Sequence, residues 1–315
     1  MSQQQKDALK EMVTKAPLDI GGDVIEQRAN FEKMLAARPL ADDMGTTPGE
    51  LGGVPVLSIE TGTASHNAVV LWFHGGWYVI GSPRTSAGLS SDLARRVDAK
   101  VVSVDYRLAP EHPYPAALQD ARAAYRGLLD SGADPGSIAI VGESAGGGLA
   151  VALLASLAEN GLAQPACAVL LSPWTDLTLS GETMTSMVGI DPVFTREKVS
   201  VRAADYVGSA DPADPSISPI FADLRGVAPI LIQAGSHEIL LDDSIRLARR
   251  AAIDDVAVTL DITPGVPHGF QAFAAMLDEG GAALARAAAF LDQHLSRAAV
   301  TAWGSGRYPH TAQPG

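Results

Sequence analysis

The stretch IAIVGESAGGGLAVALLASLA, residues 138–158, decides the fold. Its first residues are apolar, as in a buried strand, and its second half has the apolar spacing of a buried helix. Gly142 and Gly146 flank Ser144 at the predicted turn, which is the setting in which a G-x-S-x-G pattern has a mechanical meaning. So sharp a turn brings the two backbones together, and side chains at the glycine positions would collide. We expect Ser144 to be held in a sparsely allowed conformation, at a cost of about 1 to 3 kcal/mol, with its hydroxyl exposed.

Ser144 has two interpretations at this turn. A serine that precedes a helix commonly serves as its N-cap. The alternative is a catalytic nucleophile, which requires a base, a carboxylate that orients the base, and hydrogen-bond donors for an oxyanion. The rest of the chain offers a candidate for each of these partners.

Apolar runs typical of buried strands alternate with helical patterns along the 315 residues. This alternation predicts an α/β fold in which helices cover a mostly parallel sheet. Two further runs, at 54–60 and 256–262, bring the expected number of strands to seven or eight, and the first of them should be an outer strand. The main runs are residues 68–73, 100–106, 138–142, 168–172 and 230–235, and the helical patterns are residues 84–97, 115–130 and 244–253.

Two regions interrupt the alternation. The amino-terminal 50 residues are expected to be helical and to lack strands, and residues 175–216 form a long insertion after a central strand. Such an insertion usually lies above the carboxyl edge of the sheet, where ligands bind, so we expect both regions to form a cap. The expected organisation is amino-terminal cap helices at 1–50, the core at 51–176 and 217–300, the cap insertion at 177–216 and a flexible carboxyl-terminal tail at 301–315.

His268 is the candidate base. It follows the last predicted strand, in a loop rich in proline and glycine that would place the imidazole over the same sheet edge as Ser144. The other histidines are less suitably placed. His112 adjoins Pro113, His294 is in a terminal amphipathic helix, and His66 and His310 are in polar connections.

The candidate carboxylates follow two neighbouring strands. Glu238 comes first after the strand at 230–235 and is nearest the carboxyl edge. Asp242 and Asp243 precede a helix, where acidic residues usually act as caps that favour the helix dipole. Asp176 follows the adjacent strand and could also reach the imidazole, so it stays an alternative.

Backbone amides after the strand at 68–73 are the candidate oxyanion donors. Gly75, Gly76 and Trp77 follow this strand, and Ala145 follows the nucleophile. Two polar features nearby are expected to be scaffolding. His74 should fix its own loop by hydrogen bonds, and the loop DYRLAPEHPYP should be buried, with Asp105, Arg107 and Glu111 satisfying one another.

Charge and composition exclude several classes of protein. A net charge of −13 without a basic cluster opposes nucleic-acid binding. No run has membrane-spanning length and the first residues lack the pattern of a secretory signal, so we expect a cytoplasmic protein. Cys167 is the single cysteine and lies in an apolar run, which indicates a core residue. The histidines show no zinc-type spacing, and the chemistry above needs neither a metal nor another cofactor.

The motifs HGGW, DYRLAPEHPYPAALQD, GESAG, GSHEILLDD and PHGF, in this order, resemble the bacterial hormone-sensitive-lipase-like (family IV) esterases of the α/β-hydrolase superfamily. The resemblance covers roughly residues 55–298. It implies a serine carboxylesterase with Ser144 as nucleophile, His268 as base, Glu238 as acid and a helical cap. This chain has Trp77 where the family usually has a third glycine, and Glu238 where aspartate is more common.

The expected substrates are short-acyl esters, because a capped site that contains an indole should crowd long chains. Lactones, for example terpene lactones, use the same intermediate and remain an alternative. A non-catalytic ligand-binding protein on this scaffold is the alternative from another class, and it predicts loss of a triad member. Homodimer formation through the sheet edge is compatible with the resemblance, and the sequence leaves the oligomeric state open.

Overall fold

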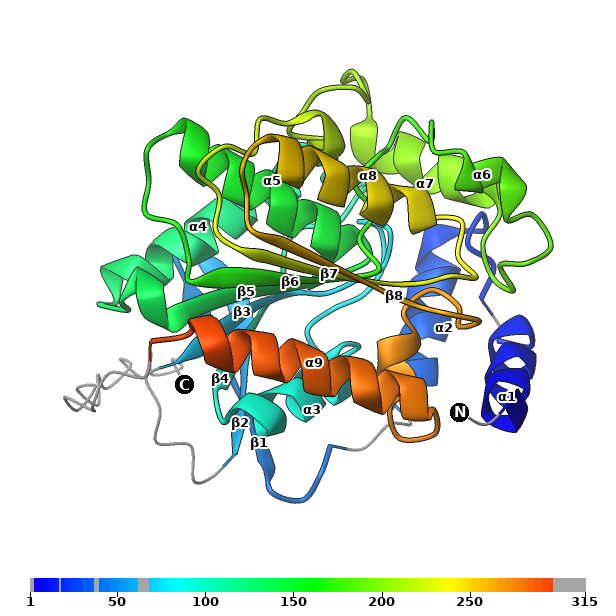
Figure 1. The fold of residues 1–315 in the computed structure, drawn as a ribbon, viewed down its shortest axis with the longest axis horizontal. Coiled ribbons are helices and arrows are strands. Elements are labelled where there is room, and N and C mark those ends of the chain that lie inside the picture. The colour runs from blue at the N-terminus through cyan, green and yellow to red at the C-terminus, as the bar shows by residue number, and fades with distance from the viewer. Residues whose placement is uncertain (1–2, 17, 37–39, 62–67, 297–315) are drawn as a thin grey trace, which may run out of the picture.

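The computed structural model describes residues 3–16, 18–36, 40–61 and 68–296. In this part of the chain one eight-stranded sheet has the order β1-β2-β4-β3-β5-β6-β7-β8 (Figure 1). The strands are β1 (Met44–Leu51), β2 (Val54–Thr61), β3 (Val69–Phe73), β4 (Lys100–Val104), β5 (Ile138–Glu143), β6 (Cys167–Leu171), β7 (Ile230–Gly235) and β8 (Val258–Thr263). Only the pairs β1–β2 and β2–β4 are antiparallel, so the prediction of a mostly parallel sheet is confirmed.

The helices of the described residues cover both faces of the sheet (Figure 1). They are α1 (Gln3–Thr14), α2 (Val24–Ala36), α3 (Ala87–Val97), α4 (Ala116–Asp130), α5 (Ala145–Glu159), α6 (Thr183–Ser186), α7 (Arg196–Val207), α8 (Leu241–Ile253) and α9 (Asp278–His294), with short 3₁₀ turns at Pro135–Ser137, Pro219–Phe221 and Phe270–Phe273. Helices α3 and α9 pack on one face, and α4, α5 and α8 pack on the other. None of these helices is long and apolar enough to cross a membrane.

Strand β3 shows why the central runs are continuously apolar. Val69 and Leu71 belong to the core cluster that contains α4 and α5, whereas Val70 and Trp72 belong to the cluster that contains α3 and α9. Because successive side chains of a strand point to opposite faces, a strand with helices on both sides buries every residue. Cys167 of β6 is also fully buried, and burial raises the pKa of its thiol to about 12, so the prediction of a core cysteine is confirmed.

The expectation that the first 50 residues lack strands is wrong. Strand β1 begins at Met44 and pairs with β2 along its whole length, so that β1 and not β2 is the outermost strand. Its sequence, MGTTPGEL, is largely polar and exposed, because an edge strand is held by backbone hydrogen bonds rather than by a buried face. Gly52 and Gly53 both have positive φ and form the two-residue turn of a tight hairpin. This glycine pair was the feature of the sequence that could have predicted β1.

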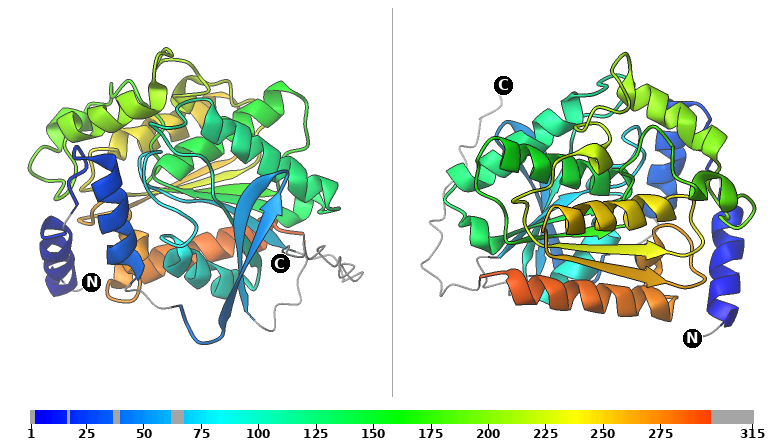
Figure 2. Two further views of the ribbon diagram at one scale, coloured as in Figure 1. Left: turned by 180° about the vertical axis from the view of Figure 1, so that it is seen from behind. Right: turned by 45° about the horizontal axis from the view of Figure 1, so that its top comes forward.

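The two regions expected to form a cap lie side by side. Helices α1, α2, α6 and α7 gather on the side toward which the arrowheads of β7 and β8 point (Figure 2). Lys198 of α7 pairs with Asp19, which precedes α2, at 3.3 Å. The guanidinium of Arg28 on α2 donates to the carbonyls of Val79, at 2.8 Å, and Ala109, at 2.9 Å. The amino-terminal helices are therefore bonded both to the insertion and to the core. The tail expected at 301–315 lies outside the described residues.

Candidate active site

The turn between β5 and α5 requires both of its glycines. A Cβ atom at Gly142 would lie 2.2 Å from the carbonyl oxygen of Gly146. A Cβ atom at Gly146 would lie 2.1 Å from the carbonyl oxygen of Phe73, at the end of β3. Both contacts are with backbone atoms, which cannot move aside as a flexible side chain can. The steric reason given for the GESAG pattern is confirmed.

Ser144 has φ 53° and ψ −119°, a combination that non-glycine residues rarely adopt. Its amide donates to the carbonyl of Leu171, at 2.9 Å, and its carbonyl accepts from the amide of Trp174, at 2.9 Å. These bonds tie the strained residue to the end of β6 and to the loop that follows it. The Ser144 side chain makes no capping hydrogen bond to α5, so the interpretation of Ser144 as a side-chain N-cap is wrong.

His268 and Glu238 are in direct contact. Nδ1 of His268 lies 2.5 Å from Oε2 of Glu238, and Oε1 of Glu238 accepts from the amide of Gly235 at 2.9 Å. The Glu238 side chain is fully buried. A carboxylate on Nδ1 fixes the proton there and leaves Nε2 of the imidazole available as a proton acceptor.

Ser144 and His268 are both anchored at the end of β6. Leu171 accepts the amide hydrogen of Ser144, and the hydroxyl of the next residue, Ser172, accepts the amide hydrogen of Gly269 at 3.2 Å. Gly269 directly follows His268. Among the described residues, no hydrogen bond joins the Ser144 hydroxyl to the His268 ring. In free enzymes such bonds are often long, and they tighten when substrate binds.

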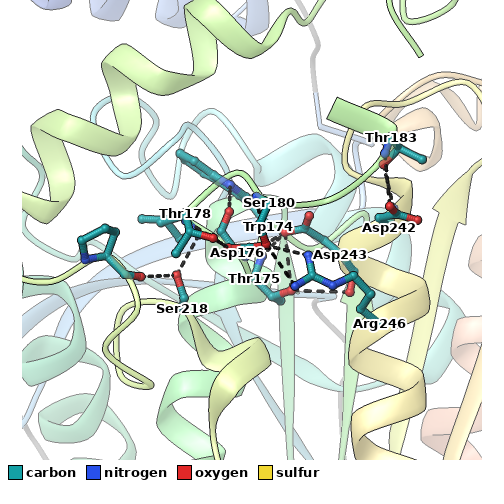
Figure 3. Close-up of polar contacts among 12 residues, drawn as sticks. Trp174, Thr175, Asp176, Thr178, Ser180, Thr183, Ser218, Asp242, Asp243 and Arg246 are labelled. Atoms are coloured by element: carbon teal, nitrogen blue, oxygen red, sulfur yellow. Dashed lines mark hydrogen bonds and ion pairs between the residues drawn. The ribbon is translucent and has the colours of Figure 1, made fainter. Parts of the chain in front are cut away.

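The alternative carboxylates are engaged elsewhere (Figure 3). Asp176 forms an ion pair with Arg246 at 2.7 Å, and Asp243 accepts the amides of Thr175 and Asp176. Asp242 accepts the amide of Thr183 at 3.1 Å. Helix α8 begins at Leu241, so Asp242 and Asp243 lie in its first turn; Asp242 binds the insertion, and Asp243 binds the segment that leads into it. Their expected position at the start of α8 is confirmed, but their carboxylates accept amides from outside the helix and make no capping hydrogen bond to it.

Among the described residues, none of the other histidines forms a hydrogen bond to Ser144. His112 is exposed, and Nδ1 of His294 lies 2.8 Å from the carbonyl of Phe290 in its own helix. His66 and His310 lie outside the described residues. Over the described ranges, no group of three or more His, Cys, Asp or Glu side chains could hold a metal ion.

The loop after β3 presents unused backbone donors beside Ser144. Within the part of the chain that the structure describes, the amides of Gly75, Gly76, Trp77 and Ala145 donate no hydrogen bond. A Cβ atom built on Gly75 would lie 3.3 Å from Cβ of Ser144, so the loop and the serine are immediate neighbours. Buried amides without partners are costly, and an anionic oxygen from a ligand would satisfy them.

His74 stabilises this loop, as its sequence position indicated. It is fully buried, it stacks on Tyr106 with ring centroids 4.2 Å apart, and its Nδ1 lies 2.8 Å from the carbonyl of Gly75. Burial lowers the pKa of His74 to about 4, so the ring is neutral.

The expected network of Asp105, Arg107 and Glu111 does not form. All three residues are exposed, and Arg107 instead forms an ion pair with Asp120 of α4 at 2.8 Å. Glu111 pairs with Arg28 of α2 at 2.7 Å. The loop therefore connects the core to the amino-terminal helices.

A row of aromatic rings crosses the site. The ring of Phe194, in the insertion, is 4.8 Å from that of His268 and 5.5 Å from that of Trp77. The ring of Phe31, on α2, is 6.5 Å from that of Trp77. Sequence reasoning identified Trp77 but missed Phe31 and Phe194, for which the only signal was their location in the two interrupting regions.

Asp243 gives a stability prediction for the base of the insertion. Burial raises the pKa of Asp243 to about 8 from an ordinary 3.8. Between these pH values the folded protein keeps a proton that the unfolded chain releases, so wild-type stability falls as pH rises through this window. The variant Asp243→Asn cannot titrate there. The quantity to measure is the melting temperature of the variant minus that of wild type, from thermal unfolding followed by circular dichroism. We expect this difference to be at least about 3 °C larger at pH 8 than at pH 5. A difference that is the same at both pH values would contradict this prediction.

A comparison with protein families identifies the fold family of this chain. Residues 70–272 match a family model described as an alpha/beta hydrolase fold. This match includes the strand-to-helix turn at Ser144, the loop at Glu238 and His268. The class defined by the fold and the site is an α/β hydrolase.

Individual relatives then give the branch of that class. The chain is 36% identical over 272 residues to an acetyl-hydrolase of Streptomyces hygroscopicus, covering 86% of this chain and 90% of the relative. It is 39% identical over 244 residues to an esterase of Acinetobacter venetianus, covering 77% and 80%. A crystal structure of an esterase from the bacterial hormone-sensitive lipase family is 40% identical, with a TM-score of 0.91 over 94% of this chain and 100% of that one. The chain belongs to the hormone-sensitive-lipase-like esterases of the α/β-hydrolase family.

Proposed function

We propose that this protein is a serine carboxylesterase that hydrolyses short-acyl esters through Ser144, His268 and Glu238. The observation that carries the proposal is the contact between Nδ1 of His268 and Oε2 of Glu238, made in a loop anchored to the same strand end as the strained Ser144. A fluorophosphonate probe tests it directly. The probe should label Ser144, as identified by mass spectrometry of the digested protein, and abolish turnover of p-nitrophenyl acetate in proportion. Labelling elsewhere, or turnover that survives full labelling of Ser144, would contradict the proposal.

The mechanism is acyl transfer in two halves. The hydroxyl oxygen of Ser144 attacks the ester carbonyl carbon as Nε2 of His268 takes its proton, and Glu238 stabilises the resulting imidazolium. The amides of Gly75, Gly76 or Trp77, together with that of Ala145, hold the oxyanion of the tetrahedral intermediate. The C–O bond then breaks and the imidazolium returns its proton to the leaving alcohol. Water, activated by the same imidazole, attacks the acyl-enzyme and releases the acid and free Ser144.

The preference for short acyl groups follows from the aromatic rings around the base. In our proposal residues 177–216 and helices α1 and α2 form the cap, which brings Phe194 and Phe31 toward Trp77. The Phe194 ring lies against that of His268, and Trp77 and Phe31 extend the row from Phe194, which leaves little length for an acyl chain. Relatives support this assignment, since one is named an acetyl-hydrolase and an ethyl acetate hydrolase of Pseudomonas putida is 32% identical.

Substituting Trp77 tests the steric part of this proposal. Trp77 is buried and has φ 54°, a conformation that glycine adopts without strain, so Trp77→Gly keeps the backbone favourable. We expect kcat/KM for p-nitrophenyl octanoate, relative to that for p-nitrophenyl acetate, to rise on the order of 10-fold. One extra or missing methylene group in a hydrophobic pocket already changes discrimination between substrates by about 1 to 3 kcal/mol. The control Phe221→Ala removes an exposed ring outside the row and should leave the ratio unchanged. An unchanged ratio in Trp77→Gly would refute the role of the indole.

No contact in the described site favours a lactone over an open-chain ester, so we propose open-chain esters as the substrates. The non-catalytic alternative predicted loss of a triad member, and this chain has a candidate residue for each of the three positions.

A further inference from the structure

Two side chains of the insertion hold the residue that follows the proposed catalytic acid. Oδ2 of Asp191 accepts the amide hydrogen of Ile239 at 2.9 Å, and the hydroxyl of Thr183 donates to the carbonyl of Ile239 at 2.7 Å. Ile239 is fully buried. Both of its backbone polar groups therefore depend on the insertion, because buried peptide groups need partners and water does not reach this one.

The other oxygen of Asp191 fixes the ring that packs against the base. Oδ1 accepts the amides of Val193, at 2.8 Å, and Phe194, at 2.9 Å. The Phe194 ring is 4.8 Å from that of His268. Asp191 is itself buried, with 7% of its surface exposed. One carboxylate thus sets the position of the backbone beside Glu238 and of the ring beside His268.

Thr183 strengthens the same connection from α6. Its hydroxyl accepts the amide hydrogen of Asp242 at 3.0 Å. Its amide donates to the Asp242 carboxylate at 3.1 Å, a contact that Figure 3 shows. The loop from Glu238 to Asp242 is therefore bonded to the insertion at Ile239 and again at Asp242. These contacts join residues that are 48 to 59 positions apart in the chain.

We infer that Asp191 and Thr183 are positioning residues, through which the insertion holds the Glu238–His268 pair in its reactive geometry. The inference rests on the proposed triad, to which it adds a role for the cap in the chemical step itself. The insertion is then a structural part of the catalytic apparatus as well as a wall of the substrate pocket.

The variant Asp191→Asn tests this inference. Asparagine has the same shape but a single acceptor oxygen, so its NH₂ group must face either the Ile239 amide or the amides of Val193 and Phe194. We expect kcat/KM to fall on the order of 10- to 100-fold, because a small displacement of reacting groups costs rates of that size. The factor should be the same for p-nitrophenyl acetate and p-nitrophenyl butyrate. In a Glu238→Gln background the same substitution should cost less than about 3-fold, because positioning of the acid then matters little.

Thr183→Val provides an independent variant that leaves Phe194 and its amide untouched. It removes the bond to the Ile239 carbonyl and the acceptor of the Asp242 amide, and we expect a smaller loss of the same kind, again reduced in the Glu238→Gln background. Thr185→Val is the matched control. Among the described residues the Thr185 hydroxyl donates to the carbonyl of Glu182 alone, at 3.0 Å and within the insertion, and its loss should leave kcat/KM within about 2-fold of wild type.

The outcomes separate this inference from the proposed function. Full activity of Glu238→Gln alone would refute the triad. If Glu238→Gln is impaired but Asp191→Asn and Thr183→Val cost as much in that background as in wild type, the triad stands and the positioning role is wrong. Unequal factors for acetate and butyrate would assign Asp191 to pocket shape and would also overturn the inference. If Asp191→Asn does not fold, Thr183→Val decides the question by the same comparison.

Discussion

Ser144→Ala should eliminate turnover of p-nitrophenyl acetate, with a loss of kcat on the order of 10⁵-fold or more. The substitution removes the attacking oxygen, and no other described hydroxyl occupies the turn between β5 and α5. Folding should be unaffected, because the Ser144 side chain makes no capping bond and the residue is held by its backbone bonds to Leu171 and Trp174. Initial-rate kinetics and thermal unfolding of the same preparation measure both effects.

Ser90→Ala is the matched control for this prediction. Ser90 is buried in α3 and its hydroxyl donates only to the carbonyl of Ala87, one helical turn earlier. Its loss should change kcat by less than about 2-fold, since such a bond contributes little to stability and nothing to chemistry. Retention of wild-type turnover in Ser144→Ala would remove the basis for the whole mechanism.

Glu238→Gln should lower kcat by roughly 10³- to 10⁴-fold while the protein stays folded. Oε1 of Glu238 accepts the amide hydrogen of Gly235, so the glutamine oxygen will occupy that position and its NH₂ group will face His268. Nδ1 of the imidazole must then accept a hydrogen bond rather than donate one. The ring proton moves to Nε2, which can no longer take the proton of Ser144.

Asp261→Asn is the corresponding control. Asp261 lies on β8 and accepts bonds from Gln233, at 3.0 Å, and Arg286, at 2.7 Å. It has no contact with the imidazole among the described residues, so its substitution should leave kcat within about 2-fold of wild type. Equal activity losses in the two variants would show that removing any nearby carboxylate is harmful and would deny Glu238 its specific role.

The parts of the fold that follow from local pattern were predictable. Strands β3, β5 and β6 are buried on both faces, which forces continuous apolar runs, and their order along the chain places residues after them at one sheet edge. The same reasoning, applied to β5, β7 and β8, selected Ser144, Glu238 and His268 as candidates, and the structure brings the last two into contact. Strand β1 was not predicted, because an exposed edge strand needs no apolar run and backbone pairing leaves little trace in composition.

Side-chain partners across long separations could not be predicted in the same way. Arg107 was assigned to neighbours within its own loop, but its partner Asp120 is on the next helix, and Glu111 binds an arginine 83 residues away. Asp191 and Phe194 lie in an insertion without periodicity, so nothing local indicated that they meet the acid loop and the base. Such contacts depend on how the cap packs on the core, which is a property of the tertiary structure alone.

The bonds from Asp191 and Thr183 to Ile239 limit how this enzyme could be given a new substrate range. A chimera that receives the insertion of a relative would acquire a new pocket, but it would work at full rate only if the graft also supplied acceptor and donor groups for the Ile239 peptide. Exposed positions such as Val188 and Ile190 are better choices for randomised libraries, since within the described ranges neither forms a hydrogen bond to the loop that contains Glu238.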